Sequence, residues 1–182
     1  MDITPYFDPV DFNAIGFPKE SYDASLLISN VCFFHPDGQL DLNGVEFAVI
    51  GVPESRNAYN NSSCSLAPDE IRSQFYRLYR WEKAVKVVDM GNLILGKTVE
   101  DTYQVLSDIL AYLIENKIIP IVLGGSNDLA YANYRAYEKL EQVVNIVAVD
   151  SRFDLGSEEA EIRSDRYLNR IILQQPNYLL NY

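Results

Sequence analysis

Residues 118–128 read IIPIVLGGSND and residues 144–154 read VNIVAVDSRFD, and these two stretches decide the fold. In each, an almost wholly apolar run of strand length ends in a polar loop. Such runs are typical of strands that are buried on both faces of a parallel sheet. Because ligands bind beyond the carboxyl ends of parallel strands, we expect the functional edge of the molecule at these two loops.

Strands and helices are predicted to alternate on both sides of the first stretch. This alternation is typical of an α/β fold with a mostly parallel sheet. Residues 45–182 are predicted to form this α/β domain. Residues 1–44 have no strong period and are predicted to form an N-terminal extension, in which residues 39–42 could pair with Val31–Phe34 as a hairpin. The predicted strands are Glu46–Val52, Val85–Asp89, Ile118–Leu123 and Val143–Val149, and the predicted helices lie near residues 68–82, 98–116, 128–140 and 158–175.

The composition limits the classes of partner. The 182 residues include 15 Lys plus Arg and 26 Asp plus Glu, which gives a formal net charge of −11. An acidic chain without a basic run is a poor ligand for nucleic acid or for an anionic membrane, so neither is expected as a partner. The first residues do not resemble a signal peptide, and the cytoplasm is the expected compartment. The single histidine, His35, lies in a predicted turn and is expected at the surface.

The loop after the first stretch has two glycines. Gly124 and Gly125 allow the backbone to turn sharply and allow a ligand to approach closely. The alternative is an ordinary turn from a strand to a helix, in which Ser126 or Asn127 caps the helix.

The loop after the second stretch places two carboxylates four residues apart. Asp150 and Asp154 could converge on one cation, because hard metal ions prefer several oxygen ligands. Arg152 lies between them and carries a permanent positive charge. The alternative is therefore a salt-bridged cluster.

A third segment matches the spacing of a phosphate-binding P-loop. Gly91, Gly96, Lys97 and Thr98 have the required positions between a predicted strand and a predicted helix. The interior of the loop is bulky and apolar, and two acidic residues follow at once, where phosphates would bind. Nucleotide binding therefore remains only a minor alternative.

Five segments occur in an order that resembles the arginase–agmatinase–formimidoylglutamase superfamily, the ureohydrolases. The resemblance implies a three-layer arginase-like α/β fold of which this chain contains only the N-terminal half. The eight-stranded parallel sheet of that family places strands of the other half between its third and fourth strands. The resemblance therefore implies that the chain is truncated, that it closes its sheet differently, or that a partner completes the sheet. The five segments are VIGVP at 49–53, LAPDEIR at 66–72, DMGN at 89–92, PIVLGGSND at 120–128 and VAVDSRFD at 147–154.

The resemblance also implies a site for two manganese ions, in altered form. The family has Gly-Gly-Asp-His-Ser where this chain has Gly-Gly-Ser-Asn-Asp at 124–128. Ser126 is at the position of the acid, Asn127 at that of a metal-binding histidine, and Asp128 at that of the serine. In the second motif, Asp-Ala-His-x-Asp, both acids are kept as Asp150 and Asp154. Arg152 is at the position of the second metal-binding histidine.

These departures predict a degenerate metal site. No metal cofactor is expected, and the chain is predicted to be a catalytically inactive family member that acts as a binding or assembly subunit, either as a homo-oligomer or with a partner. One alternative is a metal-dependent hydrolase of guanidino or formimino C–N bonds that uses Asp150, Asp154 and the loop near Asn57. The other alternative is the P-loop-like nucleotide binder.

Overall fold

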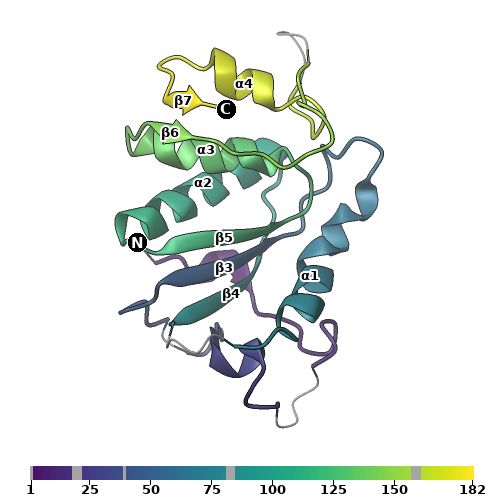
Figure 1. The fold of residues 1–182 in the computed structure, drawn as a ribbon, viewed down its shortest axis with the longest axis vertical. Helices are drawn as coiled ribbons and strands as arrows, with labels where there is room; N and C mark the ends of the chain where they lie inside the picture. Colours follow the sequence, from purple (N-terminus) through teal and green to yellow (C-terminus); the bar gives the residue numbers. More distant parts are fainter. Residues whose placement is uncertain (1, 18–21, 39, 81–84, 157–160) are drawn as a thin grey trace.

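The computed structural model describes residues 2–17, 22–38, 40–80, 85–156 and 161–182. Its centre is a mixed sheet around β4 (Figure 1). On one edge of β4 lies β3, which pairs with it in parallel. The other edge of β3 pairs in parallel with β5. On its other edge β4 pairs with β2 in parallel and with β1 in antiparallel orientation. These strands are β1 (Phe7–Asp8), β2 (Val31–Phe33), β3 (Phe47–Val52), β4 (Val87–Leu93) and β5 (Ile119–Gly124).

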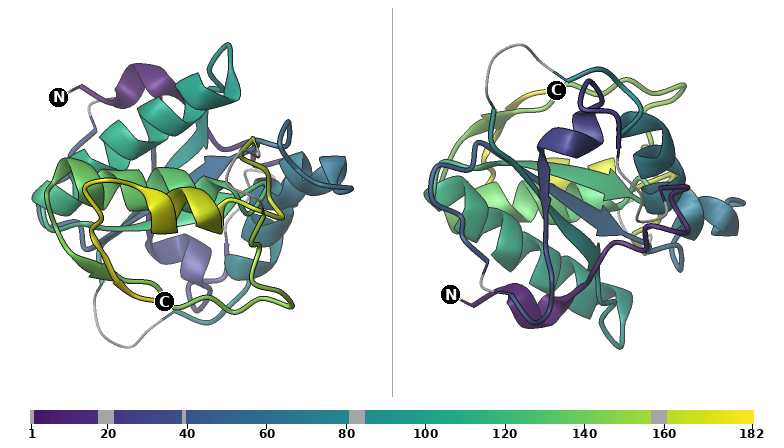
Figure 2. Two further views of the ribbon diagram at one scale, coloured as in Figure 1. Left: turned by 90° about the horizontal axis from the view of Figure 1, so that it is seen from above. Right: turned by 90° about the horizontal axis from the view of Figure 1, so that it is seen from below.

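Helices cover both faces of the sheet and give the predicted three-layer α/β arrangement. The long helix α2 (Val99–Glu115) and helix α3 (Leu129–Lys139) lie on one face, and α1 (Ala67–Phe75) lies on the other (Figures 1 and 2). The short helix α4 (Leu168–Leu173) packs against α3. Three 3-10 turns complete the helical elements: η1 (Thr4–Tyr6), η2 (Leu27–Asn30) and η3 (Ser62–Leu66).

The alternating side chains of β3 fill two separate cores. Ala48 and Ile50 face α2 and α3, whereas Val49 faces the opposite core, which also contains Tyr76 and Leu27. A strand that buries both sets of side chains must be apolar throughout, as the sequence of β3 is. The start of α2 is fixed by a capping box, because Thr98 and Asp101 bind each other's backbone N–H. Among the helices of the described residues, none combines the length and the apolar character that crossing a bilayer requires.

The predicted fourth strand of the sheet is wrong. Only Val144–Asn145 forms a strand, β6, and it pairs with β7 (Leu179–Asn181) outside the main sheet. Val147 is 90% exposed and Val149 is fully exposed. A strand needs a hydrogen-bonding neighbour, and within the described residues no strand lies between β5 and this segment.

The predicted N-terminal hairpin is also wrong. β2 pairs in parallel with β4, and residues 40–42 do not form a strand; Gln39 lies outside the described residues. By pairing with the edge of β4, β2 forms backbone hydrogen bonds and also buries Val31. A two-stranded hairpin would leave Val31 exposed to water. Because β1 and β2 both join the sheet, the N-terminal residues contribute to the core, and the boundary at residue 45 remains a prediction.

Two predicted helices are shorter than expected. The helix predicted at 68–82 ends at Phe75, because the following residues pair with the N-terminal segment: Leu27 N–H donates to Leu78 O and Arg80 N–H donates to Ser25 O. The helix predicted at 158–175 forms only at 168–173, and its predicted start at 158–160 lies outside the described residues.

Candidate functional site

The glycine-rich turn between β5 and α3 is packed against the end of β3. Ser126 N–H donates to Glu54 O at 3.0 Å. A Cβ atom on Gly125 would lie 2.0 Å from the same carbonyl oxygen, so only glycine allows this approach. At Gly124 the nearest atom, on the Leu129 side chain, would be 3.3 Å away. The turn therefore brings the loops after β3 and β5 together at the carboxyl edge of the sheet.

Below this turn lies a buried hydrogen-bond chain. Asp128 is fully buried and accepts hydrogen bonds from the hydroxyls of Ser126 and Tyr103. The Tyr103 hydroxyl in turn accepts from Asn57 Nδ2 at 3.1 Å. Burial, followed by the charge of Asp128, raises the pKa of Tyr103 far above its usual value, so this phenol stays protonated. The chain fixes the loop that contains Asn57 relative to the turn.

Tyr103 was not predicted as a site residue. It lies on the apolar stripe of α2, where its neighbours at helical spacing are Leu106 and Leu110. A phenol on such a stripe needs a hydrogen-bond partner in the core, and this was the available signal.

The loop after the second apolar stretch meets the turn through Asp150. Asn127 Nδ2 donates to Asp150 Oδ2 at 3.0 Å. The Ser151 hydroxyl and the Arg152 backbone N–H both donate to Asp150 Oδ1 at 3.3 Å. Desolvation raises the pKa of Asp150, but the hydrogen bonds from Arg152 and Ser151 outweigh it and lower the pKa overall. This carboxylate is therefore ionised at neutral pH.

Asp154 lies close by in a different environment. Its side chain is buried and its backbone is in the left-handed region, with φ at +44°. Burial, followed by the charge of Asp150, raises the pKa of Asp154. Arg152 Nε lies 4.0 Å from Asp154 Oδ1, and the Arg152 side chain is 61% exposed.

The sequence predicted a salt-bridged cluster in which the Arg152 guanidinium pairs with one or both acids. In the described part of the chain this side chain has an ion pair with Asp154 alone and projects largely into water. The geometry explains the difference, because Asp150 is already bound by Asn127, Ser151 and the loop backbone. Of the two acids, the ion pair therefore involves Asp154 and not Asp150.

These residues surround one polar pocket of about 270 Å³, which we call the metal-motif pocket. The pocket brings together the positions predicted from both loops, whereas Asp128 and Asn57 lie outside its lining. Its other walls come from the loop after β3 and from the segment before α4, which are joined where Tyr59 N–H donates to the Ser164 hydroxyl at 2.8 Å. The lining residues are Ala58, Tyr59, Asn61, Gly125, Ser126, Asn127, Asp150, Ser151, Arg152, Asp154, Ser164 and Asp165.

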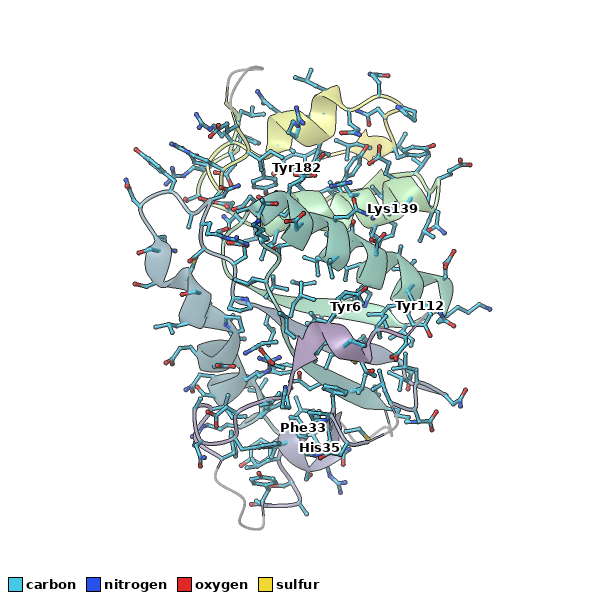
Figure 3. The ribbon with its side chains drawn as sticks, turned by 180° about the vertical axis from the view of Figure 1, so that it is seen from behind. Tyr6, Phe33, His35, Tyr112, Lys139 and Tyr182 are labelled. Atoms are coloured by element: carbon cyan, nitrogen blue, oxygen red, sulfur yellow. The ribbon has the colours of Figure 1, made fainter. Side chains whose placement is uncertain are left out.

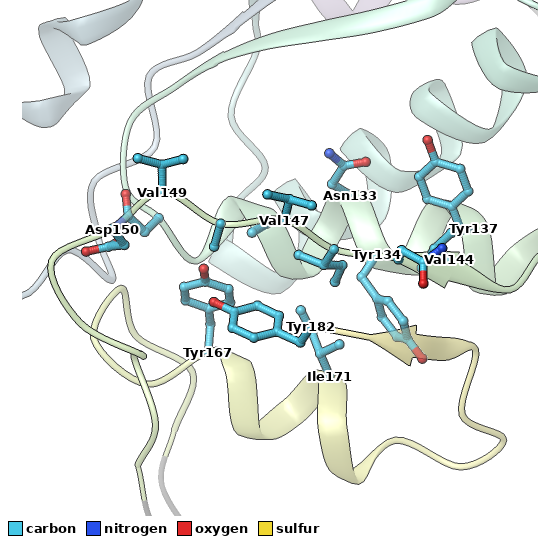
Figure 4. Close-up of a pocket in the computed structure, with 15 residues that line it drawn as sticks. Asn133, Tyr134, Tyr137, Val144, Val147, Val149, Asp150, Tyr167, Ile171 and Tyr182 are labelled. Carbon is cyan, nitrogen blue, oxygen red and sulfur yellow. The ribbon is translucent and has the colours of Figure 1, made fainter.

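The donors of the metal-motif pocket do not fit a two-manganese centre. Among the described residues, no three His, Cys, Asp or Glu side chains are grouped so that they could hold a metal ion. The candidate ligands are two carboxylates and the amide of Asn127, and Arg152 adds a positive charge beside them. His35 is exposed and lies with Phe33 at the end of the molecule opposite Tyr182, which is near Asp150 (Figures 3 and 4).

The contacts of Gly91 contradict the P-loop interpretation. This glycine lies inside β4, opposite β1, and not in a loop. Its φ is +84°, and a Cβ atom would lie 2.0 Å from the backbone oxygen of Asp8. The glycine is therefore required for a close contact between two strands.

The second half of the apparent P-loop uses its backbone groups in internal bonds. Gly96 N–H donates to the Thr102 hydroxyl at 3.0 Å, and Thr98 N–H donates to Asp101 at 2.8 Å. The Lys97 carbonyl accepts from Arg56 at 3.0 Å. Bound phosphate would need these amides free. These contacts disfavour phosphate binding by this loop.

A buried arginine joins two of the five ordered segments. Arg72 of α1 is fully buried and forms a two-pronged ion pair with Asp89 of β4, with distances of 2.8 and 2.9 Å. It also donates to Gly91 O at 2.8 Å and to Asn92 Oδ1 at 2.5 Å. Asp89 further accepts from the Tyr76 hydroxyl. Desolvation opposes the charged form of Arg72, but the adjacent Asp89 outweighs it and raises the pKa of Arg72. This network is structural and fixes α1 to the sheet.

Comparison with known proteins agrees with this architecture. A formimidoylglutamase from Streptococcus gordonii is 32% identical over 122 residues, which are 63% of this chain and 37% of that protein. One from Bacillus subtilis is 28% identical over 133 residues, which are 68% and 41% of the two chains. The chain thus spans about two fifths of the length of these curated relatives.

Solved structures show the same fold. The formimidoylglutamase structure from Bacillus subtilis superposes with a TM-score of 0.69 at 16% identity, over 91% of this chain and 54% of that one. The Trypanosoma cruzi formiminoglutamase with Mn²⁺ superposes with a TM-score of 0.65 at 18% identity, over 80% and 54%. The model of the arginase family matches residues 45–174 of this chain. The chain therefore belongs to the arginase family.

Proposed function

We propose that this chain is a non-catalytic arginase-family protein that acts as a binding or assembly subunit. The proposal depends on one observation: in the metal-motif pocket, Asn127 and Arg152 lie beside the carboxylates of Asp150 and Asp154, and no imidazole is near them. Metal-activated hydrolysis needs ligands that hold the ion firmly and leave a position for water. The Asn127 side chain offers a single neutral amide oxygen, and its amide nitrogen already donates to Asp150.

The charge of Arg152 adds to this deficit. A divalent ion between Asp150 and Asp154 would lie within a few ångströms of a guanidinium that is already 4.0 Å from Asp154. Repulsion between a dication and a cation at such a distance is on the order of several kcal/mol near a protein surface. The exposed arginine could swing away into water, so the repulsion lowers the affinity for metal without removing all binding.

The proposal is tested by restoring the two histidines. In the double variant Asn127→His/Arg152→His, we expect manganese affinity, measured by titration calorimetry, to rise at least about tenfold over the parent chain, because a repulsive charge is lost and two imidazoles are gained. Asn133→His is the matched control, since Asn133 lines the neighbouring cavity and not this pocket. An unchanged affinity in the double variant would contradict the proposal.

The alternative is a hydrolase of guanidino or formimino C–N bonds. It is favoured by the retained carboxylates and by the names of the relatives, which are formimidoylglutamases. Assays of the parent chain with formimidoylglutamate and with agmatine in the presence of manganese separate the two functions. We expect no formamide and no urea above the level of a heat-denatured sample. Turnover that is lost in Asp150→Asn would establish the alternative.

The assembly role is supported by two unpaired apolar segments. Among the described strands, β5 pairs with β3 alone, and Val147 and Val149 are exposed on an extended segment. Either a second copy or another partner could complete the sheet there. Light scattering over a range of protein concentrations distinguishes a chain that associates with itself from one that stays monomeric and needs a different partner.

A further inference from the structure

A second, larger cavity of about 600 Å³ lies on the other side of Asp150 from the metal-motif pocket. It is enclosed by α3, by the segment from β6 to Asp150, and by α4 with the C-terminal residues (Figure 4). Four tyrosines, three asparagines and several aliphatic side chains line it. We call it the tyrosine cavity, after Tyr134, Tyr137, Tyr167 and Tyr182.

Among the described residues that line this cavity, Asp150 is the only one with a charged side chain, and none is a lysine, arginine or histidine. Asp150 is bound by neutral donors: the Asn127 amide, the Ser151 hydroxyl and the Arg152 backbone. In the part of the chain that the structure describes, no cationic side chain forms an ion pair with this carboxylate. The cavity therefore ends at a negative charge that the protein itself does not neutralise.

The aromatic rings are placed next to this charge. Figure 4 shows the rings of Tyr167 and Tyr182 side by side between Asp150 and Ile171. Burial raises the pKa of Tyr167 to about 12, with further contributions from Tyr182 and from the nearby acids Asp154 and Asp150. The phenol therefore stays neutral at physiological pH. The faces of neutral tyrosine rings attract cations.

We propose that the tyrosine cavity binds an organic ammonium ion with an apolar body. The ammonium group lies beside Asp150, and the apolar body packs against Tyr167, Tyr182 and Ile171. An anionic ligand would be repelled by the Asp150 carboxylate, because no cation in the wall compensates it. A neutral apolar ligand would leave the charge of Asp150 without a counter-ion. The overall charge of −11 also favours a positively charged ligand. The site needs no metal and no hydrolysis, and it shares Asn127 and Asp150 with the metal-motif pocket.

Three probes of similar size and different charge test the proposal: phenethylamine, 2-phenylethanol and 3-phenylpropionate. By titration calorimetry at neutral pH, we expect the amine to bind at least about tenfold more tightly than the alcohol, since it adds a charge pair and a cation–π contact. The carboxylate probe is expected to bind no more tightly than the alcohol. Binding of the alcohol or the carboxylate as tight as that of the amine would overturn the proposal, as would no heat with the amine at millimolar concentration.

Two variants place the binding in this cavity. Asp150→Asn is expected to reduce the affinity for phenethylamine to that of the alcohol. Asp165→Asn is the matched control, because Asp165 lines only the metal-motif pocket, and the affinity should stay unchanged. Equal weakening in both variants would overturn the proposal. If Asp150→Asn does not fold by circular dichroism, Tyr167→Leu replaces it, with the expectation that affinity for the amine is lost.

Discussion

Arg72 and Asp89 illustrate how single residues determine the stability of this fold. Both side chains are fully buried, and each satisfies the charge of the other. In Arg72→Met we expect the free energy of unfolding to fall by about 3–5 kcal/mol, because Asp89 would remain buried without its counter-ion. Urea denaturation measures this loss.

The control for this prediction is Arg170→Met. Arg170 is exposed on α4, and no side-chain hydrogen bond or ion pair involves it in the described part of the protein. Its replacement should change stability by no more than about 0.5 kcal/mol. Similar losses in the two variants would mean that the buried ion pair has no special role.

Glu54 gives a prediction about pH. Its side chain is buried, and burial raises its pKa, but hydrogen bonds from Arg56 outweigh burial and lower the pKa below the usual value of 4.5. A carboxyl whose pKa is lowered by folding stabilises the fold at higher pH, and this contribution is lost as the pH falls through the lowered pKa.

In Glu54→Gln we expect a loss of about 1.5–3 kcal/mol at pH 7, typical of a hydrogen bond to a charged group. The difference from the parent chain should shrink as the pH is lowered below about 4.5, where the parent begins to lose the same contribution. Chemical denaturation at several pH values checks both parts. Glu100→Gln, at an exposed ion pair with Arg135, is the control and should show little change at any pH. A difference that grows toward acid pH would contradict the assignment.

At the scale of elements, the turn between β5 and α3 depends on Gly125. In Gly125→Ala we expect a loss of about 1–3 kcal/mol or more, because the new methyl group would overlap Glu54 O. Gly124→Ala is the matched control, since its nearest neighbour is the end of the flexible Leu129 side chain at 3.3 Å. Thermal unfolding of both variants measures the loss of stability, and an equal loss at the two positions would refute the packing argument.

Elements with strong local signals could be predicted from the sequence. β3, β5, α2 and α3 formed close to the expected residues because their apolar period, the Thr98 cap and the glycines are encoded within each segment. The N-terminal hairpin and the fourth strand were predicted wrongly because pairing depends on which distant strand is available. β2 pairs with an open edge of β4, whereas residues 147–149 have no neighbouring strand in the described fold.

The candidate site was predictable to the same extent. The loops at Gly125 and Asp150 line one pocket, as expected, although the segment before Asp150 is not a strand of the main sheet. Tyr103 reaches the turn with its side chain from α2, and Glu54 contacts the turn through its backbone carbonyl. The direction of the Arg152 side chain depends on competition for Asp150. Such contacts between distant segments have no local sequence pattern.

At the scale of the whole molecule, the two open edges differ in chemistry. Ile119 N–H donates to the carbonyl oxygen of Glu46, the residue before β3, so the neighbouring Pro120 has its missing N–H on the free edge of β5. Proline on an edge hinders further pairing. Residues 147–149, which follow the pairing of β6 with β7, include no proline and no charge, so they are more open to pairing than the free edge of β5.

We therefore expect association of the chain to depend on Val147 and Val149. In the double variant Val147→Lys/Val149→Lys, the increase of light scattering with protein concentration should be reduced relative to the parent chain. Leu66→Lys, at an exposed apolar residue on η3, is the control and should leave the scattering unchanged. If the scattering is the same in all three proteins, Val147 and Val149 do not mediate association of the chain.

The arginase fold of this chain surrounds a pocket in which an amide and a guanidinium lie beside two carboxylates. The manganese content of the purified protein after dialysis against excess Mn²⁺, measured by elemental analysis, tests whether that pocket can still hold a catalytic centre. Our account predicts well below one manganese per chain. Two manganese per chain, lost in Asp150→Asn, would contradict it.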